Sequence, residues 1–356
     1  MLRMMQKKDL NVHPIQVKET FIRLGLKLEK LLLPGDDEDK DKIGFEEMML
    51  KVRQKNPWFT REHVCLAFSA WAEALKEDQL NQWLQPYLTK LSQPRTSKTI
   101  AVINAGNIPL VGFHDLLSVL ISGHIYLGKN SSDDPYLLPF IAELLMKTDP
   151  WLKKRISFSE RLSGFDAVIA TGSNNSARYF DFYFGKYPHI IRMNRNGVAV
   201  LTGDEDARDL KNLGTDIFRY FGLGCRNVSR LFVPRNYNFK NFFEAIEPFN
   251  GIAQHHKYMN NYDYNKAIYL LKRIDFLDNG FLILKEDAAI ASPIAVVYYD
   301  FYDDLKSLEE KLSSEKEKIQ CVIGTNFIPF GNAQHPGLAD YADGVDTMEF
   351  LLNIEN

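Results

Sequence analysis

The sequence has few cysteines, no long hydrophobic run and no large excess of charge of one sign. Its three cysteines, Cys65, Cys225 and Cys321, are far apart and odd in number, which argues against a disulfide framework and favours a reducing compartment. The longest apolar stretches, residues 116–121 and 137–146, are much shorter than the ~20 residues that a membrane span needs. The first residues contain no signal-peptide core. We therefore expect a cytoplasmic protein without a membrane span.

The overall charge and composition exclude further classes of protein. A formal net charge of −3 and the absence of a Lys/Arg tract leave no broad basic surface for nucleic acid. A hydrophobic content of 45% and a charged content of 25% are typical of a soluble globular protein. Because 356 residues are many for one core, we expect two or three lobes.

Two common ligand-binding patterns are also missing. No Gly-x-Gly-x-x-Gly follows the first expected strand, so the usual dinucleotide fingerprint is absent. The histidines at positions 114, 189, 255, 256 and 335 do not have the spacing of metal ligands. We expect surface, capping or core roles for these histidines and no metal site.

The chain changes its pattern near residue 98. Residues 1–95 have apolar side chains at spacings of three and four, which predicts a mostly helical segment. Later residues alternate between expected strands, among them 99–104, 124–128 and 166–170, and expected helices. This alternation predicts an α/β fold with a parallel sheet and helices on its faces.

Several polar residues follow the expected strands directly. Ligands of such sheets bind beyond the carboxyl ends of the strands, where Asn107, Lys129, Gly172 and Ser173 are expected. Ser173 opens a helix and is suited to cap it, which would leave backbone N–H groups facing an anion. Taken alone, the Gly172-Ser173 pair is more often a plain turn between strand and helix, and Lys129 is more often a surface lysine.

Cys225 has unusual surroundings for a cysteine. It follows Gly222-Leu223-Gly224, between an expected amphipathic helix over residues 206–221 and an expected strand over residues 229–234. A cysteine in such a turn can present its thiol and its own N–H to a ligand together, which suits attack on a carbonyl carbon. The alternative is a small buried hydrophobic residue, the usual role that we expect for Cys65 and Cys321.

These motifs together resemble the aldehyde dehydrogenase superfamily. Asn107, Lys129, Gly172-Ser173 and Cys225 occur in the order of that superfamily's carbonyl-orienting asparagine, cofactor lysine, phosphate-binding turn and nucleophile. The sequence is still more similar to the acyl-CoA reductase family typified by the fatty-acid reductase subunit of bacterial luminescence. That resemblance rests on residues 105–109, the Cys225 loop and the tail over residues 329–348, and it covers about residues 95–356.

The resemblance implies a fold and a division into domains. It implies an aldehyde dehydrogenase-like α/β fold, with a parallel Rossmann-like cofactor domain and an α/β catalytic domain. We expect a helical segment at 1–95 that packs on the cofactor domain at 96–205. A catalytic domain at 206–330 and a tail at 331–356 would follow.

Two departures from the superfamily bear on the chemistry. Hydrolytic members have a water-activating glutamate in a Glu-Leu-Gly-Gly-Lys motif, and this sequence has Arg192 at or near that position. Members that prefer NAD follow the cofactor lysine with Pro-Ser-Glu, whereas this sequence has Asn130-Ser131-Ser132. Without a carboxylate at Ser132 the 2′-phosphate of NADPH is not repelled, although Asp133 and Asp134 would partly restore the repulsion.

The resemblance therefore implies an NADPH-dependent acyl-CoA reductase with Cys225 as nucleophile and Asn107 as oxyanion donor. Lys129, Ser132, Gly172 and Ser173 would bind NADP(H). The substrate would be a long-chain acyl-CoA or an acyl-carrier thioester. The alternatives are a coenzyme-A-acylating or hydrolytic aldehyde dehydrogenase that works in the oxidative direction, or a non-catalytic acyl-binding subunit. A homo-oligomer is compatible with each of these.

Overall fold

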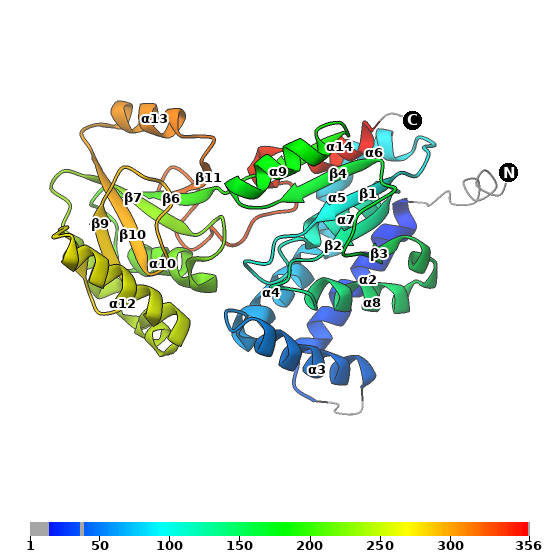
Figure 1. Ribbon diagram of the computed structural model, residues 1–356, viewed down its shortest axis with the longest axis horizontal. Coiled ribbons are helices and arrows are strands. Elements are labelled where there is room, and N and C mark those ends of the chain that lie inside the picture. The colour runs from blue at the N-terminus through cyan, green and yellow to red at the C-terminus, as the bar shows by residue number, and fades with distance from the viewer. Residues whose placement is uncertain (1–13, 36–38, 355–356) are drawn as a thin grey trace. The chain divides into compact units, whose positions relative to one another are not determined.

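Figure 1 shows a computed structural model of the chain, which describes residues 14–35 and 39–354. The chain forms two compact units. The first unit takes in Met1–Met193 and Gly337–Asn356, and the second consists of Asn194–Pro336. The first unit is therefore discontinuous in sequence, because the end of the chain returns to it.

The first unit is built on a five-stranded parallel sheet with the strand order β3-β2-β1-β4-β5. The predicted parallel sheet with intervening helices is thus confirmed. One strand of three residues was not predicted, because so short a segment shows no periodicity. The strands are β1 (Thr99–Ile103), β2 (Ile125–Lys129), β3 (Ile156–Phe158), β4 (Ala167–Thr171) and β5 (His189–Arg192). The connecting helices are α7 (Phe113–Ile121), α8 (Leu137–Thr148), η2 (Pro150–Lys154) and α9 (Asn174–Phe184).

Helices precede this sheet in the sequence, as predicted for residues 1–95 over the part that the structure describes. Helix α2 contacts α4 and α8, and α3 also contacts α8, so these helices share one hydrophobic core with the sheet's own helices (Figure 1). The rings of Phe21 and Phe113 meet edge to face in this core. The helices are α2 (Pro14–Leu32), α3 (Lys40–Lys55), α4 (Arg61–Ala74), α5 (Glu77–Leu84), η1 (Gln85–Tyr87) and α6 (Leu88–Leu91).

The C-terminal segment is hydrogen-bonded to these N-terminal helices. The hydroxyl of Tyr341 accepts a bond from Trp83 Nε1 at 2.8 Å and lies 2.9 Å from the hydroxyl of Tyr87. Tyr87 in turn donates to a carboxylate oxygen of Asp346 at 2.6 Å. The tail motif that contributed to the resemblance therefore stabilises the fold of the first unit. The short helices of this segment are η5 (Ala342–Gly344) and α14 (Thr347–Leu352).

The second unit contains a six-stranded sheet with the order β11-β6-β7-β10-β9-β8, in which only β8 runs antiparallel to its neighbour among the described strands. Its strands are β6 (Asn196–Val200), β7 (Val228–Pro234), β8 (Leu277–Asp278), β9 (Ile283–Glu286), β10 (Val296–Tyr302) and β11 (Ile319–Ile323). Its helices are α10 (Ala207–Phe218), η3 (Arg219–Gly222), α11 (Phe239–Ile246), η4 (Glu247–Gln254), α12 (His256–Leu271) and α13 (Leu305–Ser314).

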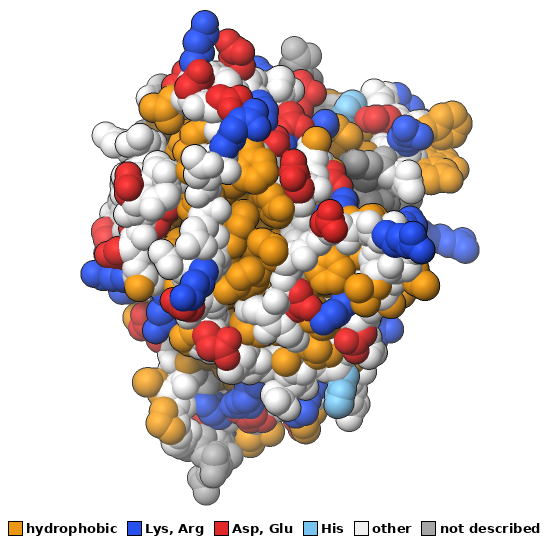
Figure 2. All heavy atoms as spheres, turned by 90° about the vertical axis from the view of Figure 1, so that its left-hand side faces the viewer, with side chains coloured by type: hydrophobic (Ala, Val, Ile, Leu, Met, Phe, Trp, Pro, Cys, Tyr) orange, Lys and Arg blue, Asp and Glu red, His pale blue; other side chains and the backbone are white. Residues whose placement is uncertain are grey.

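One face of the second unit has an apolar surface as well as the buried core. Figure 2 shows hydrophobic side chains gathered along the middle of this face, with charged side chains around them. Exposed apolar side chains of this unit are Tyr264, Leu270, Leu271, Leu277, Leu305 and Phe327.

Candidate active site

Cys225 lies in the turn between η3 and β7, where the sequence placed it. It is half-buried, in contrast to Cys321, which lies in the core of the second unit as predicted. Burial raises the pKa of the Cys321 thiol to about 11, although the nearby positive charge of Arg226 opposes this. Burial also raises the pKa of Cys65, which packs against the core of the first unit. Cys65 is also half-buried, but it lies on helix α4, whereas Cys225 lies in a turn that begins with glycines.

The backbone before Cys225 is strained. The helix predicted over residues 206–221 ends at Phe218, because Tyr220 and Phe221 have φ angles of 53° and 58° in the left-handed region. Non-glycine residues rarely adopt this conformation, and it costs free energy that the surroundings must offset. The ring of Phe221 lies 4.2 Å from that of His255, which supports the turn. The strained residues hold the chain in the sharp turn that precedes the thiol.

Asn227 holds the Cys225 turn through its side chain, which is 1% exposed. Its Oδ1 accepts a hydrogen bond from the N–H of Gly224 at 2.8 Å. Its Nδ2 donates to the carbonyl oxygens of Asp216 at 2.9 Å and Arg219 at 2.8 Å. A Cβ atom on Gly224 would lie 2.8 Å from Asn227 Oδ1, so the turn requires glycine there. One buried amide therefore fixes both sides of the turn.

Asp216 connects α10 to the segment around residues 329–334. Its carboxylate is fully buried and accepts hydrogen bonds from the N–H groups of Gly331 at 2.6 Å and Ala333 at 3.0 Å. Burial raises the pKa of Asp216 to about 6, and the two N–H donors only partly oppose this. Gln334, in the same segment, places its amide within 3.7 Å of the position that a Gly224 Cβ would occupy. The segment is thereby held beside the Cys225 turn.

Sequence reasoning named Cys225 but not Asn227, Asp216 or Gln334. A signal for Asp216 was present, because it lies on the same helix face as the apolar residues Leu213 and Ile217. Gln334 belongs to the tail motif, whereas nothing in the sequence marked Asn227 as buried.

On the first unit, Gly172 and Ser173 form the turn between β4 and α9. Ser173 is the N-cap of α9, and its hydroxyl accepts a hydrogen bond from Ser176 N–H at 3.2 Å, as predicted. A Cβ on Gly172 would lie 2.9 Å from both Phe180 and Ser176 side-chain atoms, so only glycine permits this close packing. The first N–H groups of an α-helix lack partners within the helix and attract anions. This end of α9 therefore suits a phosphate.

Asn107 follows β1 in an exposed loop, at the same edge of the sheet as Lys129, the last residue of β2. A Cβ on Gly106 would lie 2.6 Å from the side chain of Ser131, so the loop after β1 packs against the turn after β2. Within the described residues, no hydrogen bond or ion pair engages the Lys129 ammonium group. The structure thus places these predicted residues at one edge of the first unit.

Ser132 is exposed in the turn after β2, and Asp133 beside it is also exposed. Asp134 is different, because it is 6% exposed and its Oδ1 accepts a hydrogen bond from Leu137 N–H at the start of α8. Burial raises the pKa of Asp134 to about 6. Asp134 therefore caps α8, and Asp133 remains as the exposed carboxylate next to Ser132.

Arg192, the last residue of β5, forms a buried ion pair with Asp115 of α7. Its Nη1 and Nη2 donate to the two carboxylate oxygens at 2.7 and 3.0 Å, and Nη2 also donates to Thr347 Oγ1 at 2.9 Å. Both charged side chains are 6% exposed. Arg192 therefore joins β5 to α7 and α14, a stabilising contact within the first unit.

The described residues contain no group of three or more His, Cys, Asp or Glu side chains arranged to hold a metal ion. His114 is half-buried and bonded to the carbonyl oxygen of Leu338 at 2.9 Å, and His255 caps α12 through a bond from Tyr258 N–H. None of the helices in residues 14–35 and 39–354 has the length and apolar character needed to cross a bilayer.

The candidate residues divide between the two units. Asn107, Lys129, Ser132 and the Gly172-Ser173 turn belong to the first unit, and Cys225 belongs to the second. The first unit thus offers polar groups at one sheet edge, and the second offers a thiol in a rigid turn.

Comparison with solved structures supports the fold. The chain is similar in structure to the indole-3-acetaldehyde dehydrogenase AldA of P. syringae, with a TM-score of 0.62 and 17% identity over 85% of this chain and 70% of that one. Aldehyde dehydrogenase 21 of Physcomitrella patens gives a TM-score of 0.63 and 12% identity, over 97% of this chain and 85% of that one. The expected aldehyde dehydrogenase-like α/β fold is therefore confirmed.

A comparison of sequences identifies the family. No curated protein sequence matches the chain. The model of the acyl-CoA reductase (LuxC) family matches residues 41–246, which is more than half of the chain and includes Asn107, Lys129, Gly172-Ser173 and Cys225. The chain belongs to the acyl-CoA reductase (LuxC) family, and it is an oxidoreductase of the class of aldehyde-related acyl reductases and dehydrogenases.

Proposed function

We propose that this protein reduces an acyl thioester to an aldehyde with NADPH, through an acyl-enzyme on Cys225. The observation that carries the proposal is the rigid turn that presents Cys225, in a chain of the acyl-CoA reductase family. In this proposal the first unit holds the cofactor and the second supplies the nucleophile. A long-chain acyl-CoA or acyl-carrier thioester is the substrate class, and the cytoplasm is the proposed location.

The first step belongs to Cys225. Its thiolate attacks the thioester carbon, a new C–S bond forms, and the bond to the departing thiol breaks. That thiol leaves as a thiolate and takes up a proton. A half-buried cysteine suits this role, because the sulfur must be reachable and must also be shielded from competing water.

Negative charge develops on the carbonyl oxygen during the attack. We assign its stabilisation to the amide of Asn107 and the N–H of Cys225. The loss of one such donor typically lowers a rate by about 10²–10³-fold, so this pair would supply a large part of the catalysis. The bond between Asn227 and Gly224 orients the backbone just before the Cys225 N–H, and a rigid donor pays little reorganisation during the reaction.

The residues of the first unit suit a nicotinamide cofactor. The amino-terminal end of α9, with Gly172 and Ser173, would hold phosphate groups, and Lys129 would bind a ribose or phosphate oxygen. The AldA structure to which this chain is similar is a complex with NAD+. When bound, NADPH supplies the hydride that reduces the acyl-enzyme. The oxyanion left on the Cys225 adduct then collapses, so that aldehyde departs and the thiolate is restored.

NADPH is favoured over NADH by the turn after β2. Ser132 is exposed and uncharged where NAD-preferring relatives have a carboxylate, so a 2′-phosphate would meet no repulsion there. Of the two aspartates that follow, Asp134 is buried as the cap of α8. Asp133 is therefore the one of these two carboxylates that is exposed beside Ser132, so repulsion of the 2′-phosphate there is reduced.

The fate of the acyl-enzyme follows from the surroundings of Arg192. Residues 192–196 contain no carboxylate to activate water, and Arg192 itself is held in the ion pair with Asp115. General-base assistance is typically worth about 10²–10⁴-fold, so hydrolysis of the acyl-enzyme should be slow. Reduction can then compete successfully for the acyl group.

The test is to incubate the protein with a series of acyl-CoA chain lengths and to follow NADPH oxidation and aldehyde formation. We expect aldehyde with NADPH, and only slow release of free acid when NADPH is omitted. Cys225→Ala should form no aldehyde. Cys321→Ala is the matched control for that variant, because it removes a buried cysteine instead. If acid forms rapidly without NADPH, or if no chain length yields aldehyde, the reductase proposal fails.

A further inference from the structure

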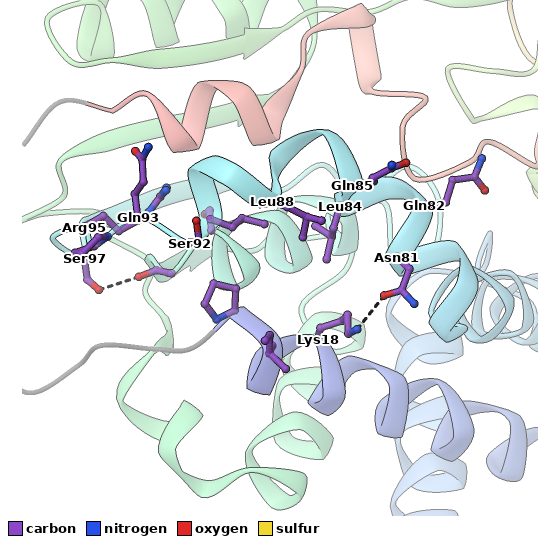
Figure 3. Close-up of a pocket in the computed structure, with 16 residues that line it drawn as sticks. Lys18, Asn81, Gln82, Leu84, Gln85, Leu88, Ser92, Gln93, Arg95 and Ser97 are labelled. Atoms are coloured by element: carbon purple, nitrogen blue, oxygen red, sulfur yellow. Dashed lines mark hydrogen bonds between the residues drawn. The ribbon is translucent and has the colours of Figure 1, made fainter.

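The first unit contains a cavity of about 810 Å³ that none of the candidate active-site residues lines (Figure 3). Its volume is in the range of cavities that hold small ligands. The walls come from the start of α2, from α5, η1 and α6, from residues 92–97, and from Ser122 and Gly123. Ser97 precedes β1 and Gly123 precedes β2, so the cavity lies at the amino-terminal edge of the sheet, opposite Lys129. The cavity is therefore separate from the candidate cofactor-binding residues of this unit.

Much of the cavity wall is apolar. Leu84, Leu88 and Leu91 line it from one side and Ile15 from the start of α2. Ile15 is 60% exposed and Leu88 is 57% exposed, although both lie in a concave surface. Apolar side chains exposed together in a hollow mark a site that binds an apolar group.

The charged side chains that line the cavity among the described residues are both positive. They are Lys18 and Arg95, and none of the described lining residues is Asp or Glu. Within residues 14–35 and 39–354, neither cation forms an ion pair with a carboxylate, and the ammonium of Lys18 donates to Asn81 Oδ1 at 2.9 Å. Figure 3 shows Arg95 at the left and Lys18 farther to the right, with Leu84 and Leu88 above Lys18 in this view.

A smaller hollow in the same unit provides a contrast. Among the described residues it is lined by Lys27, Lys30 and Lys42 together with Asp39 and Asp41. Lys27 pairs with Asp41 at 2.9 Å and Lys30 with Asp39 at 2.7 Å, so two of these three lysines have a carboxylate partner within the hollow. In the larger cavity neither described cation has such a partner, and this positive charge favours an anion.

Arg95 is the group best placed to receive that anion. Its guanidinium group carries five N–H donors, and one of its nitrogens donates to the carbonyl oxygen of Lys90. Its Cδ lies 3.9 Å from the position of a Cβ on Gly123, so the side chain runs along the cavity wall. Burial lowers the pKa of Arg95, with no opposing effect from a carboxylate.

A second guanidinium lies behind the same wall. Arg155 is fully buried, and its Nη1 donates to Ser97 Oγ at 2.8 Å and to the Gly123 carbonyl oxygen at 3.0 Å. The hydroxyls of Ser92, Ser97 and Ser122 each donate to a backbone carbonyl oxygen. These hydroxyls therefore do not compete with Arg95 for an anion, and Arg155 adds positive potential behind it.

We propose that this cavity binds a free fatty acid, with its carboxylate on Arg95 and its alkyl chain along Leu84, Leu88 and Ile15. The apolar wall with a cation at one end is complementary to an amphiphile with a negative head. The site does not depend on the proposed reductase chemistry, because it shares no residue with it.

The test measures binding of dodecanoate to the full chain by isothermal titration, below the concentration at which micelles form. Dodecanol and dodecyltrimethylammonium serve as neutral and cationic probes of the same chain length. We expect dodecanoate to bind more tightly than dodecanol, and the cation not to bind at this cavity. Because dodecanoate would bind only the folded protein, the melting temperature of the protein should rise with the concentration of dodecanoate.

Two substitutions locate the binding. Arg95→Gln should weaken dodecanoate by about tenfold to hundredfold, the value of a hydrogen bond to a charged group, and should leave dodecanol unchanged. Leu88→Glu should weaken both probes. The controls are Arg23→Gln and Leu50→Glu, which alter an exposed arginine and an exposed leucine outside the cavity. Turnover without fatty acid should be the same in all four variants.

Three outcomes would overturn the proposal. Dodecanoate affinity unchanged in both Arg95→Gln and Leu88→Glu would place its binding elsewhere. Equal affinity for the anionic and cationic probes would show that Arg95 does not bind the carboxylate. A dimer of the unliganded protein that Leu88→Glu dissociates would show that a second copy of the chain covers the apolar wall.

Discussion

The Cys225 turn and the loops that contain Asn107 and Ser132 differ in what holds them. At Cys225, the buried side chains of Asn227 and Asp216 hydrogen-bond the backbone on both sides and attach the tail segment. The loops after β1 and β2 place Asn107 and Ser132 at the surface. Substitutions near Cys225 should therefore change stability as well as rate, whereas those at Asn107 and Ser132 should change rate or affinity alone.

The largest effect is expected from the nucleophile itself. Cys225→Ala should abolish the covalent acyl adduct, because no other cysteine lies in an accessible turn. Cys65→Ala and Cys321→Ala should keep one adduct per chain, since burial raises the pKa of both thiols and inert thiols of this kind do not attack. Mass spectrometry after mixing with acyl-CoA measures this. An adduct that survives in Cys225→Ala would mean that another residue is the nucleophile.

Asn107→Ala should give the next largest effect. We expect kcat to fall by about 10²–10³-fold through the loss of an oxyanion donor. Because Asn107 is exposed, the free energy of unfolding should change by less than about 0.5 kcal/mol. Steady-state kinetics and urea unfolding test the two statements separately. A large loss of stability with unchanged kcat would show that Asn107 stabilises the fold and does not act in catalysis.

Asn227→Ala, unlike Asn107→Ala, should lower the stability of the protein strongly. Removing the amide leaves the N–H of Gly224 and several carbonyl oxygens without partners, at a cost of about 2–4 kcal/mol in the free energy of unfolding. The matched control is Asn260→Ala on α12, where the side chain is exposed and should contribute little. Urea unfolding of both variants checks this. Equal stability of Asn227→Ala and Asn260→Ala would show that the Cys225 turn does not need the clamp.

The buried carboxylate of Asp216, which holds the segment around residues 329–334, should make stability depend on pH. Its pKa is about 6 in the folded protein and 3.8 in its ordinary state, so the folded protein binds more protons between these values. The free energy of unfolding should therefore fall as the pH rises from about 4 to 6, by up to about 3 kcal/mol. In Asp216→Asn this contribution should disappear, whereas that of Asp134, whose pKa burial also raises to about 6, should remain. Unfolding curves of both proteins across that pH range give the difference, and a difference that is constant with pH would contradict the shifted pKa.

The sequence predicted the parallel sheet of the first unit, its helices and the Ser173 cap, because each depends on local patterns that repeat along the chain. It also predicted the position of the Cys225 turn. It did not predict that the helix ends at Phe218, because the left-handed conformations of Tyr220 and Phe221 depend on partners far away in sequence, such as His255. The roles of Asn227, Asp216 and Arg192 were missed for the same reason. Their partners become neighbours only after the chain has folded.

The smallest effect is expected at Ser132, in the exposed turn. Ser132→Glu places a carboxylate where NAD-preferring relatives have one, so it should weaken NADPH by about 1–3 kcal/mol through repulsion of the 2′-phosphate. NADH binding should be unchanged or stronger, and the stability should stay the same because the side chain is exposed. The matched control is Asp133→Asn, which removes the neighbouring exposed carboxylate and should strengthen NADPH slightly. Fluorescence titration of both cofactors with all three proteins measures the shifts. If the wild type prefers NADH, the cofactor assignment is wrong, and the turn after β2 does not read the 2′-phosphate.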